Sequence, residues 1–491
     1  MATALTTAQV VTALGVTGKE QLWNAGVILD GLSTSVWTKI MSGSAGGRAI
    51  ASVSNLKNLR GTQMNFYTEA ELGGPGVQGS GQDRSAAGEN INGAMFALTF
   101  GNHHHSVILD NVAAAQTMIG HDAWERARGK LAPWFKRERE WTLEAQVVAA
   151  CAAKASRCVA YANPQATSVE GLRSAHTPDS AFFRRLARKL SDNQAKPFTV
   201  AKFGAQEVKR YVLVVPEAGL DDQSNDPAWQ NLLAQAGNRG NSNFLYSGEV
   251  PSWAGATILP YTVENHSADG PQGCLAQAQA FTGAVLDFST DSVQTITGGG
   301  SARAAALTSH LYMRGFPGAA FSSHEVTKIA AETSTKYALI QDADTNKFGM
   351  ISYTTTNGNT LTSVLHLGAT DGTNRKNTIG NVDWDSGVWA GLHTTSFAIG
   401  SKVVPCNSYG QPFIRIYGLG MDSMMHGWGA VLGGAGAGKR TINNNDNMQA
   451  IFQPGFEEQW GVAPYLDVNG VPRGLVMGYA ALNLDGMPVI E

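Results

Sequence analysis

The segment Gly433-Gly-Ala-Gly-Ala-Gly-Lys-Arg440 is the part of the sequence that comes nearest to a chemical site. A phosphate-binding loop needs glycines whose backbone amides can approach a phosphate, a lysine for the outer phosphates, and then a serine or threonine hydroxyl for magnesium. Arg440 occupies the hydroxyl position, and Thr441 comes one residue too late. The segment therefore fits a loop at a subunit contact better than a nucleotide site. A nucleotide-binding enzyme that uses Gly433 to Lys439 is kept as the alternative.

Histidines offer two further candidates for chemistry. In His103-His-His105, only the first and third side chains of a strand would share a face, and an ion would need two more ligands from elsewhere. His324-Glu325 begins like a zinc-protease helix, but Lys328 stands where the second histidine is needed. We therefore expect no metal ion, no cofactor and no catalytic residue, and no enzyme activity.

The remaining acidic and sulfur-bearing residues are typical of structural roles. The acidic pairs lack a full calcium-loop pattern and are expected in turns, where Asp is common for backbone reasons; they are Asp221 with Asp222, Asp342 with Asp344, and Asp383 with Asp385. The four cysteines contain no Cys-x-x-Cys pair and are expected as buried thiols in a reducing compartment; they are Cys151, Cys158, Cys274 and Cys406.

Composition indicates a chain that is covered by partners. Charged residues make up 15% of the 491 residues, against roughly 25% in ordinary soluble proteins. Protein contact surfaces are depleted in Lys, Glu and Asp, so this depletion favours an assembling protein. The net charge of -3 gives no overall basic field that would condense onto nucleic acid. Neither an export signal nor an apolar run long enough for a membrane span is expected.

A ribbon is predicted in the first quarter of the chain. Alternating apolar residues predict strands over Thr62 to Thr68 and Ala94 to Phe100, followed by an extended run from His103 to Asp110. The connection from Gly73 to Asn92 is Gly-rich and polar, so it cannot bury a core of its own. An isolated ribbon is marginal in water. We expect a neighbouring copy of the chain to hold it, and a surface loop is the alternative.

A long amphipathic helix is predicted from Asp122 to Lys154, opened by a capping box at Asp122-Ala-Trp-Glu125. Pro133 removes one backbone hydrogen bond inside it, which predicts a bend, with two shorter helices as the alternative. Its basic residues lie mostly off the apolar stripe and are expected in solvent, as are those of Phe183 to Lys189. The apolar stripe comprises Trp124, Ala127, Leu131, Trp134, Trp141, Ala145 and Val148, and its three tryptophans are expected to anchor the helix to its own domain.

These segments together resemble a known family. Leu72-Gly-Gly-Pro-Gly-Val77, the ribbon around it, Leu131-Ala-Pro-Trp-Phe135 and Asp226-Pro-Ala-Trp-Gln230 resemble the major capsid proteins of tailed bacteriophages, specifically the N4-like podovirus group. The resemblance covers roughly residues 55 to 265 and, more weakly, 418 to 485. It implies an α+β fold, the Hong Kong 97-like capsid fold. In that fold the ribbon is an extended loop that overlaps a neighbouring subunit, and the long helix is the spine of a peripheral domain.

The resemblance also implies a domain division. It gives residues 1–60 as an N-terminal arm, 61–110 as the extended loop, 111–175 as the peripheral domain with the spine helix, 176–265 as the first part of the axial domain, 266–415 as a β-rich insertion, and 416–491 as the completion of the axial and peripheral domains.

Local patterns in the later part of the chain predict individual elements. A basic amphipathic helix is expected over Asp179 to Leu190, and a buried strand over Arg210 to Pro216. Asn357-Gly358 predicts a hairpin turn between Phe348–Tyr353 and Leu361–Leu367. The Gly-rich piece from Gly418 is expected to be helix-like, before a final strand at Leu475 to Leu482; a helix is also expected over Asp226 to Ala236, and another over Ser301 to Arg314.

The sequence thus predicts a structural protein of the virion, made in the bacterial host cytoplasm. We expect pentamers and hexamers that close into an icosahedral head around double-stranded DNA, with scaffolding, portal and decoration proteins as further partners and no membrane. The predicted intersubunit contact residues are Leu72, Gly73, Gly74, Pro75, Gly76 and Val77. A β-rich surface adhesin is a second alternative, but it leaves the ribbon and the long helix unexplained.

Overall fold

The computed structural model describes residues 37, 49–53, 63–69, 93–106, 109–110, 123–203, 206–224, 226–231, 255–261, 286–287, 294–297, 336–342, 345, 347–353, 355–357, 360–366, 378–379, 382–383, 387–390, 392, 396–397, 402–428, 439–442, 451–452 and 454–490. The chain folds into two units, each assembled from segments distant in sequence. Unit 1 comprises Met1–Cys158, Leu190–Tyr211 and Leu419–Leu475, and unit 2 comprises Val159–Lys189, Val212–Gly418 and Val476–Glu491.

The long strand β24 (Pro454–Pro464) is the centre of the main sheet of unit 1. It pairs antiparallel with β4 (Gly101–Ser106), β21 (Met424–Trp428) and β22 (Lys439–Ile442). Strand β1 (Ile50–Val53) then pairs parallel with β21, which joins segments almost 400 residues apart. The three histidines at 103 to 105 lie on β4, as the strand interpretation predicted.

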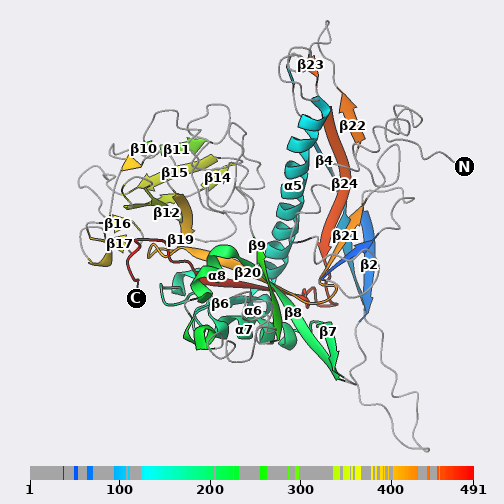
Figure 1. Cartoon of the computed structure of the whole chain (residues 1–491), viewed down its shortest axis with the longest axis horizontal. Helices are drawn as coiled ribbons and strands as arrows, with labels where there is room; N and C mark the ends of the chain where they lie inside the picture. The colour runs from blue at the N-terminus through cyan, green and yellow to red at the C-terminus, as the bar shows by residue number, and fades with distance from the viewer. Residues whose placement is uncertain are drawn as a thin grey trace, which may run out of the picture. The chain divides into compact units, whose positions relative to one another are not determined.

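The predicted long helix is present as α5 (Ala123–Ala153), which packs against β24 (Figure 1). It is continuous through Pro133, so the alternative of two shorter helices is wrong. A short helix, α6 (Ala155–Cys158), follows it. The side chains of α5 that form its buried apolar face are spaced at three and four residues, as an amphipathic helix requires; they include Leu131, Phe135, Leu143, Val147, Val148 and Cys151.

The predicted ribbon is also present in unit 1. Strands β2 (Gln63–Glu69) and β3 (Gly93–Thr99) pair antiparallel along their whole lengths. Two further small pairings complete this unit. Strand β5 (Leu109–Asp110) pairs with β23 (Ile451–Phe452), and β7 (Phe198–Phe203) pairs with the first half of β8 (Gln206–Pro216).

One sheet of unit 2 has two central strands that are buried on both faces. It contains β6 (Val159–Tyr161), β25 (Leu475–Ala481), β20 (Phe413–Leu419) and the second half of β8, with β9 (Ala256–Tyr261) paired to β8. Every residue of β20 and β25 is buried, which is typical of a central strand. The helices of this unit are α7 (Ser180–Asp192), α8 (Glu217–Ser224) and the short 3-10 helix η3 (Val169–Gly171).

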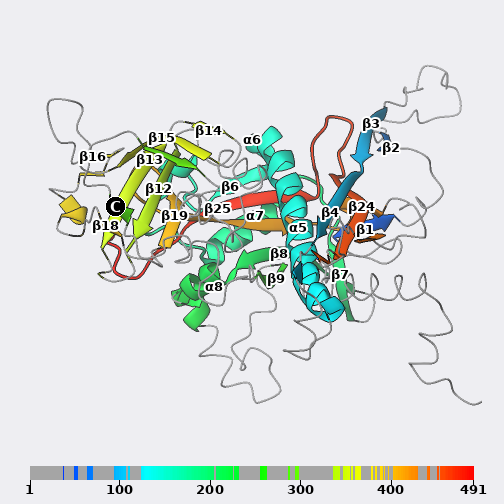
Figure 2. The same cartoon turned by 90° about the horizontal axis from the view of Figure 1, so that it is seen from above.

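The other sheet of unit 2 runs in the order β11 (Gln294–Thr297), β15 (Thr360–His366), β13 (Phe348–Tyr353), β12 (Lys336–Gln341) and β19 (Lys402–Cys406) (Figure 2). The predicted hairpin is confirmed, because β14 (Thr355–Asn357) pairs with β15 with Asn357 opposite Thr360. Two-stranded pairs also occur, β10 (Leu286–Asp287) with β18 (Ser396–Phe397) and β16 (Thr378–Ile379) with β17 (Val382–Asp383).

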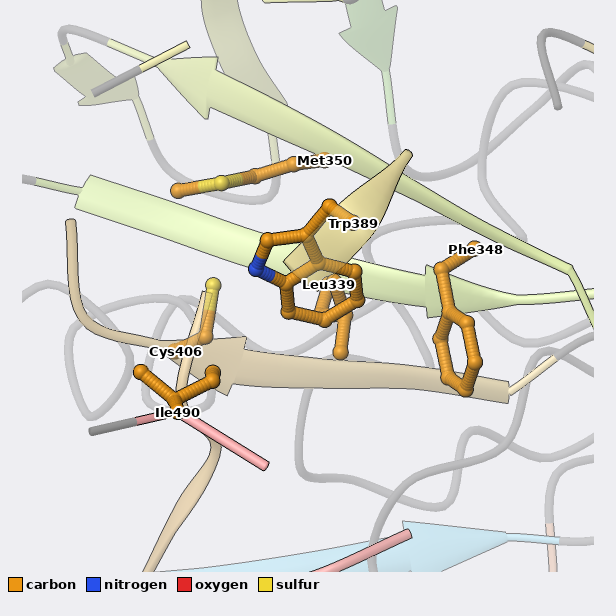
Figure 3. Close-up of a cluster of buried hydrophobic side chains, with 6 residues drawn as sticks. All are labelled: Leu339, Phe348, Met350, Trp389, Cys406 and Ile490. Atoms are coloured by element: carbon orange, nitrogen blue, oxygen red, sulfur yellow. The ribbon is translucent and has the colours of Figure 1, made fainter. Parts of the chain in front are cut away.

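The apolar core beside this second sheet gathers side chains from five separate stretches of chain. Figure 3 shows the Trp389 indole, from the 3-10 helix η6 (Gly387–Trp389), in the middle of the cluster. Its ring lies edge-on to that of Phe348, with 5.7 Å between the ring centroids. The buried members are Leu339, Phe348, Met350, Trp389, Cys406 and Ile490.

Two predictions from the last quarter of the chain have different outcomes. The helix-like piece expected from Gly418 is wrong, because Met424–Trp428 is strand β21, and its pairing to β24 and β1 overrides the local sequence pattern. The final strand is confirmed as β25.

Of the helix expected from Asp226, residues 227–231 are helical and the rest lies outside the described residues. The helix expected over Ser301 to Arg314 lies wholly outside them.

Candidate assembly site

The two faces of the β2–β3 ribbon differ in burial because successive side chains of a strand point to opposite faces. Phe66 lies directly opposite Phe96, and the two rings stack with their centroids 5.4 Å apart. Phe96 also meets the Tyr465 ring edge-on at 5.4 Å. Leu98 is fully buried beside Ala463. The inner face of the ribbon therefore packs on its own unit.

This packing corrects one prediction. The ribbon was expected to depend on a neighbouring copy for support, because two strands alone bury too little apolar surface. Strands β2 and β3 instead rest on residues 463 and 465 of the same chain, which follow them by almost 400 positions. The sequence contains no local pattern that reveals such a distant pairing.

The outer face of the ribbon carries an exposed apolar pair. Tyr67 lies directly opposite Met95, and the side chains are 58% and 73% exposed. The Tyr67 ring lies over Gly93, where any Cβ atom would overlap it. Neighbours on the same face are small or polar, such as Asn65 and Ala97. An exposed cross-strand pair of large apolar side chains is a candidate contact surface.

The predicted contact residues Leu72 to Val77 belong to the connection between β2 and β3, since β2 ends at Glu69 and β3 begins at Gly93. They lie outside the described residues, so their role stays a prediction. Tyr67 and Met95 were not predicted as contact residues. The alternation in the two strands was visible in the sequence, but which face lies on the body of the unit was not.

A buried polar cluster connects α5 to the main sheet of unit 1. The Arg139 guanidinium donates from Nη2 to Nε2 of His426 over 2.9 Å, and it lies 5.9 Å from the ring of Trp460. On the same sheet, the His103 ring stacks on Trp460 with centroids 4.3 Å apart. Since a guanidinium only donates hydrogen bonds, His426 must accept with a neutral ring nitrogen. The cluster thus links helix α5 to strands β21 and β24.

The electrostatics of this cluster follow from burial. Burial and the positive charge of Arg139 together hold the pKa of His426 well below its usual 6.5. Burial raises the pKa of Glu458 from 4.5 to about 8, and the charge of Arg139 opposes that rise. In both groups, removal from water disfavours the charged form, and the pKa shifts as a result.

The sequence pattern misplaced several side chains of α5. Lys136 and Arg139 were expected in solvent with the other basic residues, but each is only 4% exposed. The groups that Arg139 contacts, His426 and Trp460, lie in strands distant in sequence. Trp134 is half-buried, and the side chains of Trp124 and Trp141 lie outside the described residues. The proposed tryptophan anchors therefore stay a prediction, while the apolar core of the helix is made by other residues.

The candidate chemical sites do not form sites in the described structure. Lys439 is the first residue of strand β22, opposite Glu457, whereas the lysine of a phosphate-binding loop opens a helix. Asp342 accepts hydrogen bonds from the backbone and hydroxyl of Thr345, as its predicted turn position requires. Asp221 and Asp222 instead lie on helix α8 and Asp383 lies in strand β17, so the turn prediction is wrong for these three. Among the described residues, no group of three His, Cys, Asp or Glu side chains could hold a metal ion. His324, Lys328 and Asp344 lie outside that set.

The described cysteines and helices add two findings. Cys151, Cys158 and Cys406 are buried thiols, as predicted, and burial raises the pKa of Cys151 and of Cys406. Cys274 lies outside the described residues. In the part of the chain that the structure covers, no helix is both long and apolar enough to cross a membrane.

Comparison with known proteins finds likeness in structure but not in sequence. Neither a family model nor a curated protein sequence matches the chain. The capsid asymmetric unit of cyanophage Pam1 superposes with a TM-score of 0.52 at 12% identity, covering 92% of this chain and 94% of that chain. The capsid of Ralstonia phage GP4 superposes with a TM-score of 0.49 at 11% identity, covering 91% of this chain and 90% of that chain. The capsid of Helicobacter pylori bacteriophage KHP30 superposes with a TM-score of 0.48 at 12% identity, covering 91% of this chain and 92% of that chain.

The Pam1 likeness extends over nearly the whole of both chains, and it agrees with the ribbon, the long helix and the mixed sheets described above. The chain therefore has an α+β fold of the Hong Kong 97-like capsid type.

Proposed function

We propose that this chain is the major capsid protein of a tailed bacteriophage and that it assembles into pentamers and hexamers of an icosahedral head around double-stranded DNA. The observation that carries the proposal is the likeness of fold to a phage capsid subunit over almost the full length of both chains. Membership of the N4-like podovirus group rests on the sequence resemblance alone.

Each element has a mechanical role in this proposal. Residues 61–110 form the extended loop, which rests on its own unit through Phe66 and Phe96 and presents Tyr67 and Met95 to a neighbouring subunit. The residues from Leu72 to Val77 extend that contact. Helix α5 is the spine of the peripheral domain (111–175), and the Arg139 cluster holds it on the sheet. The arm (1–60), the axial domain (176–265, completed by 416–491) and the insertion (266–415) keep their expected roles.

The proposed partners follow from that role. Copies of the chain contact one another in the shell, and scaffolding, portal and decoration proteins act with it during assembly. The chain is made in the host cytoplasm and ends in the virion. With a net charge of -3 it would surround DNA as a near-neutral wall without sequence-specific contacts.

The nucleotide-binding alternative loses support because Lys439 lies in a strand paired to β24. A measurement of nucleotide binding by the full chain and by the variant Lys439→Ala separates the two functions. The capsid proposal predicts no binding by either protein, and binding that is lost with Lys439 would favour the enzyme.

The assembly role itself is tested by removing the ribbon connection. Deletion of residues 73–92, with Asn-Gly in their place, removes no residue of the paired strands and leaves a five-residue connection between Glu69 and Gly93. We expect the shortened chain to fold with an unchanged circular dichroism spectrum and to form no closed shells in the electron microscope. Normal shells from this variant would contradict the proposed role of the extended loop.

A further inference from the structure

Glu458 is a buried carboxyl group in the central strand of unit 1. Its side chain is fully buried, and neither carboxyl oxygen has a hydrogen-bond partner among the described residues. A buried carboxylate without hydrogen bonds is costly, so such a group either pairs with a charge or takes up a proton. Its neighbour Glu457 is opposite Lys439, but these two positions lie on the other face of the sheet.

Glu458 faces helix α5. It shares a face of β24 with Trp460, two residues on, and the Trp460 ring lies beneath Arg139. The group therefore sits in the layer between the helix and the sheet. Arg139 is the charge that acts on it, and no ion pair joins their atoms in this structure because Arg139 donates to His426 instead.

Charged and titratable groups approach this layer from every packed element. Helix α5 contributes Arg139 and three other buried charged residues, each of which has interaction partners of its own. Strand β4 places His103 directly opposite Glu458, and β21 contributes His426. Strand β22 brings position 440 into register with position 456. The other three residues of α5 are Lys136, Glu140 and Glu144.

We propose that Glu458 is the proton-binding residue of a switch in which Arg139 changes its partner from His426 to Glu458, altering how α5 packs on the sheet. In the first state of the proposed switch Glu458 carries a proton and Arg139 donates to His426 of strand β21, as it does in this structure. When Glu458 releases its proton to solvent, its carboxylate draws the guanidinium towards β24. The proposal is independent of capsid assembly, because both partners lie within unit 1.

The direction of the pH effect follows from burial. A carboxyl whose folded-state pKa is raised stabilises the folded chain fully below its unfolded pKa of 4.5, and this contribution is lost as the pH rises to about 8. The pKa of His426 is lowered, so its contribution is lost at acid pH instead. Ionisation of Glu458 therefore lowers the stability of the folded chain at alkaline pH, and protonation of His426 lowers it at acid pH.

The variant Glu458→Gln tests the proposal in the full chain, because it keeps the shape of the side chain but cannot ionise. Asp485→Asn is the matched control, since it removes one carboxylate from an exposed position. Infrared difference spectra at neutral pH should show a protonated-carboxyl band in the wild type and in Asp485→Asn that is missing from Glu458→Gln. A band of equal height in all three proteins would overturn the proposal.

Chemical unfolding across pH gives a second, quantitative readout. The ratio of folded to unfolded chain for Glu458→Gln, relative to wild type, should rise by up to about tenfold per pH unit between pH 4.5 and 8. If the free energy of unfolding depended on pH in the same way in the wild type and in Glu458→Gln, the proposal would be overturned. A Glu458→Gln chain that fails to fold would also overturn it, because Arg139 would then need an ionised carboxylate as its counter-ion.

The change of partner has its own structural test. Structures of the full chain at about pH 6 and about pH 9, on either side of the folded-state pKa, should place the Arg139 guanidinium on His426 in the first and on Glu458 in the second. An unchanged bond from Arg139 to His426 at both pH values would contradict the switch.

Discussion

Tyr67 and Met95 form a directly opposed pair of exposed apolar side chains on the outer face of the β2–β3 ribbon. The inner face of the same two strands packs on Tyr465 through an edge-on contact with Phe96. The ribbon is thus fixed to its own unit on one side and presents apolar surface on the other. This division gives the proposed assembly role a specific pair of residues to test.

Introducing charge at this pair should block assembly without unfolding the chain. Burial of a large apolar side chain contributes about 1.5–3 kcal/mol, so Tyr67→Asp with Met95→Asp should raise the concentration needed for assembly at least about tenfold. Light scattering during assembly measures this concentration. Circular dichroism should match the wild type because both side chains are exposed, and thermal unfolding should fall only slightly, since two like charges then lie directly opposite each other.

The control for that experiment is Asn65→Asp, which adds a charge on the same face of the ribbon without removing an apolar side chain. It should assemble close to the wild-type concentration. Equal loss of assembly in this control would mean that charge, rather than loss of the apolar pair, blocks the shell. Wild-type assembly by the double variant would contradict the role of Tyr67 and Met95.

Two glycines of unit 1 should respond oppositely to alanine. At Gly461 of β24 a Cβ atom would overlap the backbone carbonyl of Thr99, so Gly461→Ala should destabilise by about 1–3 kcal/mol. Gly129 of α5 is exposed with no atoms within 4 Å of a Cβ. Gly129→Ala should therefore stabilise by about 0.5–1 kcal/mol, the ordinary helix preference for alanine. Chemical unfolding of both variants checks the signs, and a stabilising Gly461→Ala would contradict the packing of β24.

The neutral state of His426 predicts loss of stability in acid. Its folded-state pKa is depressed, so its contribution is present above pH 6.5 and is lost as the pH falls below that value. The variant His426→Gln can still accept from Arg139 but does not titrate. Below pH 6.5 the wild type should lose free energy of unfolding relative to this variant by at most about 1.4 kcal/mol per pH unit. Curves that remain parallel in acid would contradict a buried neutral His426.

The core of unit 2 should be sensitive to truncation at Phe348. This ring is fully buried against Trp389, so Phe348→Ala should cost about 3–5 kcal/mol of unfolding free energy. Val388, one residue before Trp389, is 52% exposed. Val388→Ala should stay within about 0.5 kcal/mol of wild type. Denaturant titration distinguishes the two, and a similar small loss in both would contradict the cluster shown in Figure 3.

Local patterns in the sequence predicted the elements well. Period-two alternation located both strands of the ribbon, and spacing at three and four located α5 together with the proline inside it. The hairpin at this point of the chain was also found, because its turn is encoded by adjacent residues, although Asn357 proves to be the last residue of strand β14, opposite Thr360. Each of these features depends on neighbours in sequence.

Features that depend on distant pairing could not be predicted in the same way. The sequence of strand β21 was predicted to be a helix-like, glycine-rich piece, because the local sequence does not reveal its pairing with β1 and β24. Arg139 and Glu458 look like surface charges by type, and only the contact of α5 with β24 buries them. The outer face of the ribbon could be identified only once Tyr465 and Ala463 were known to cover the inner one.

The central claim, that this chain is a self-assembling shell protein, is tested most directly by sedimentation velocity of the purified full chain, with electron microscopy of the fastest fraction. We expect rings or closed icosahedral shells in that fraction. A monomer or small oligomer that persists at high protein concentration and with added scaffolding protein would contradict it.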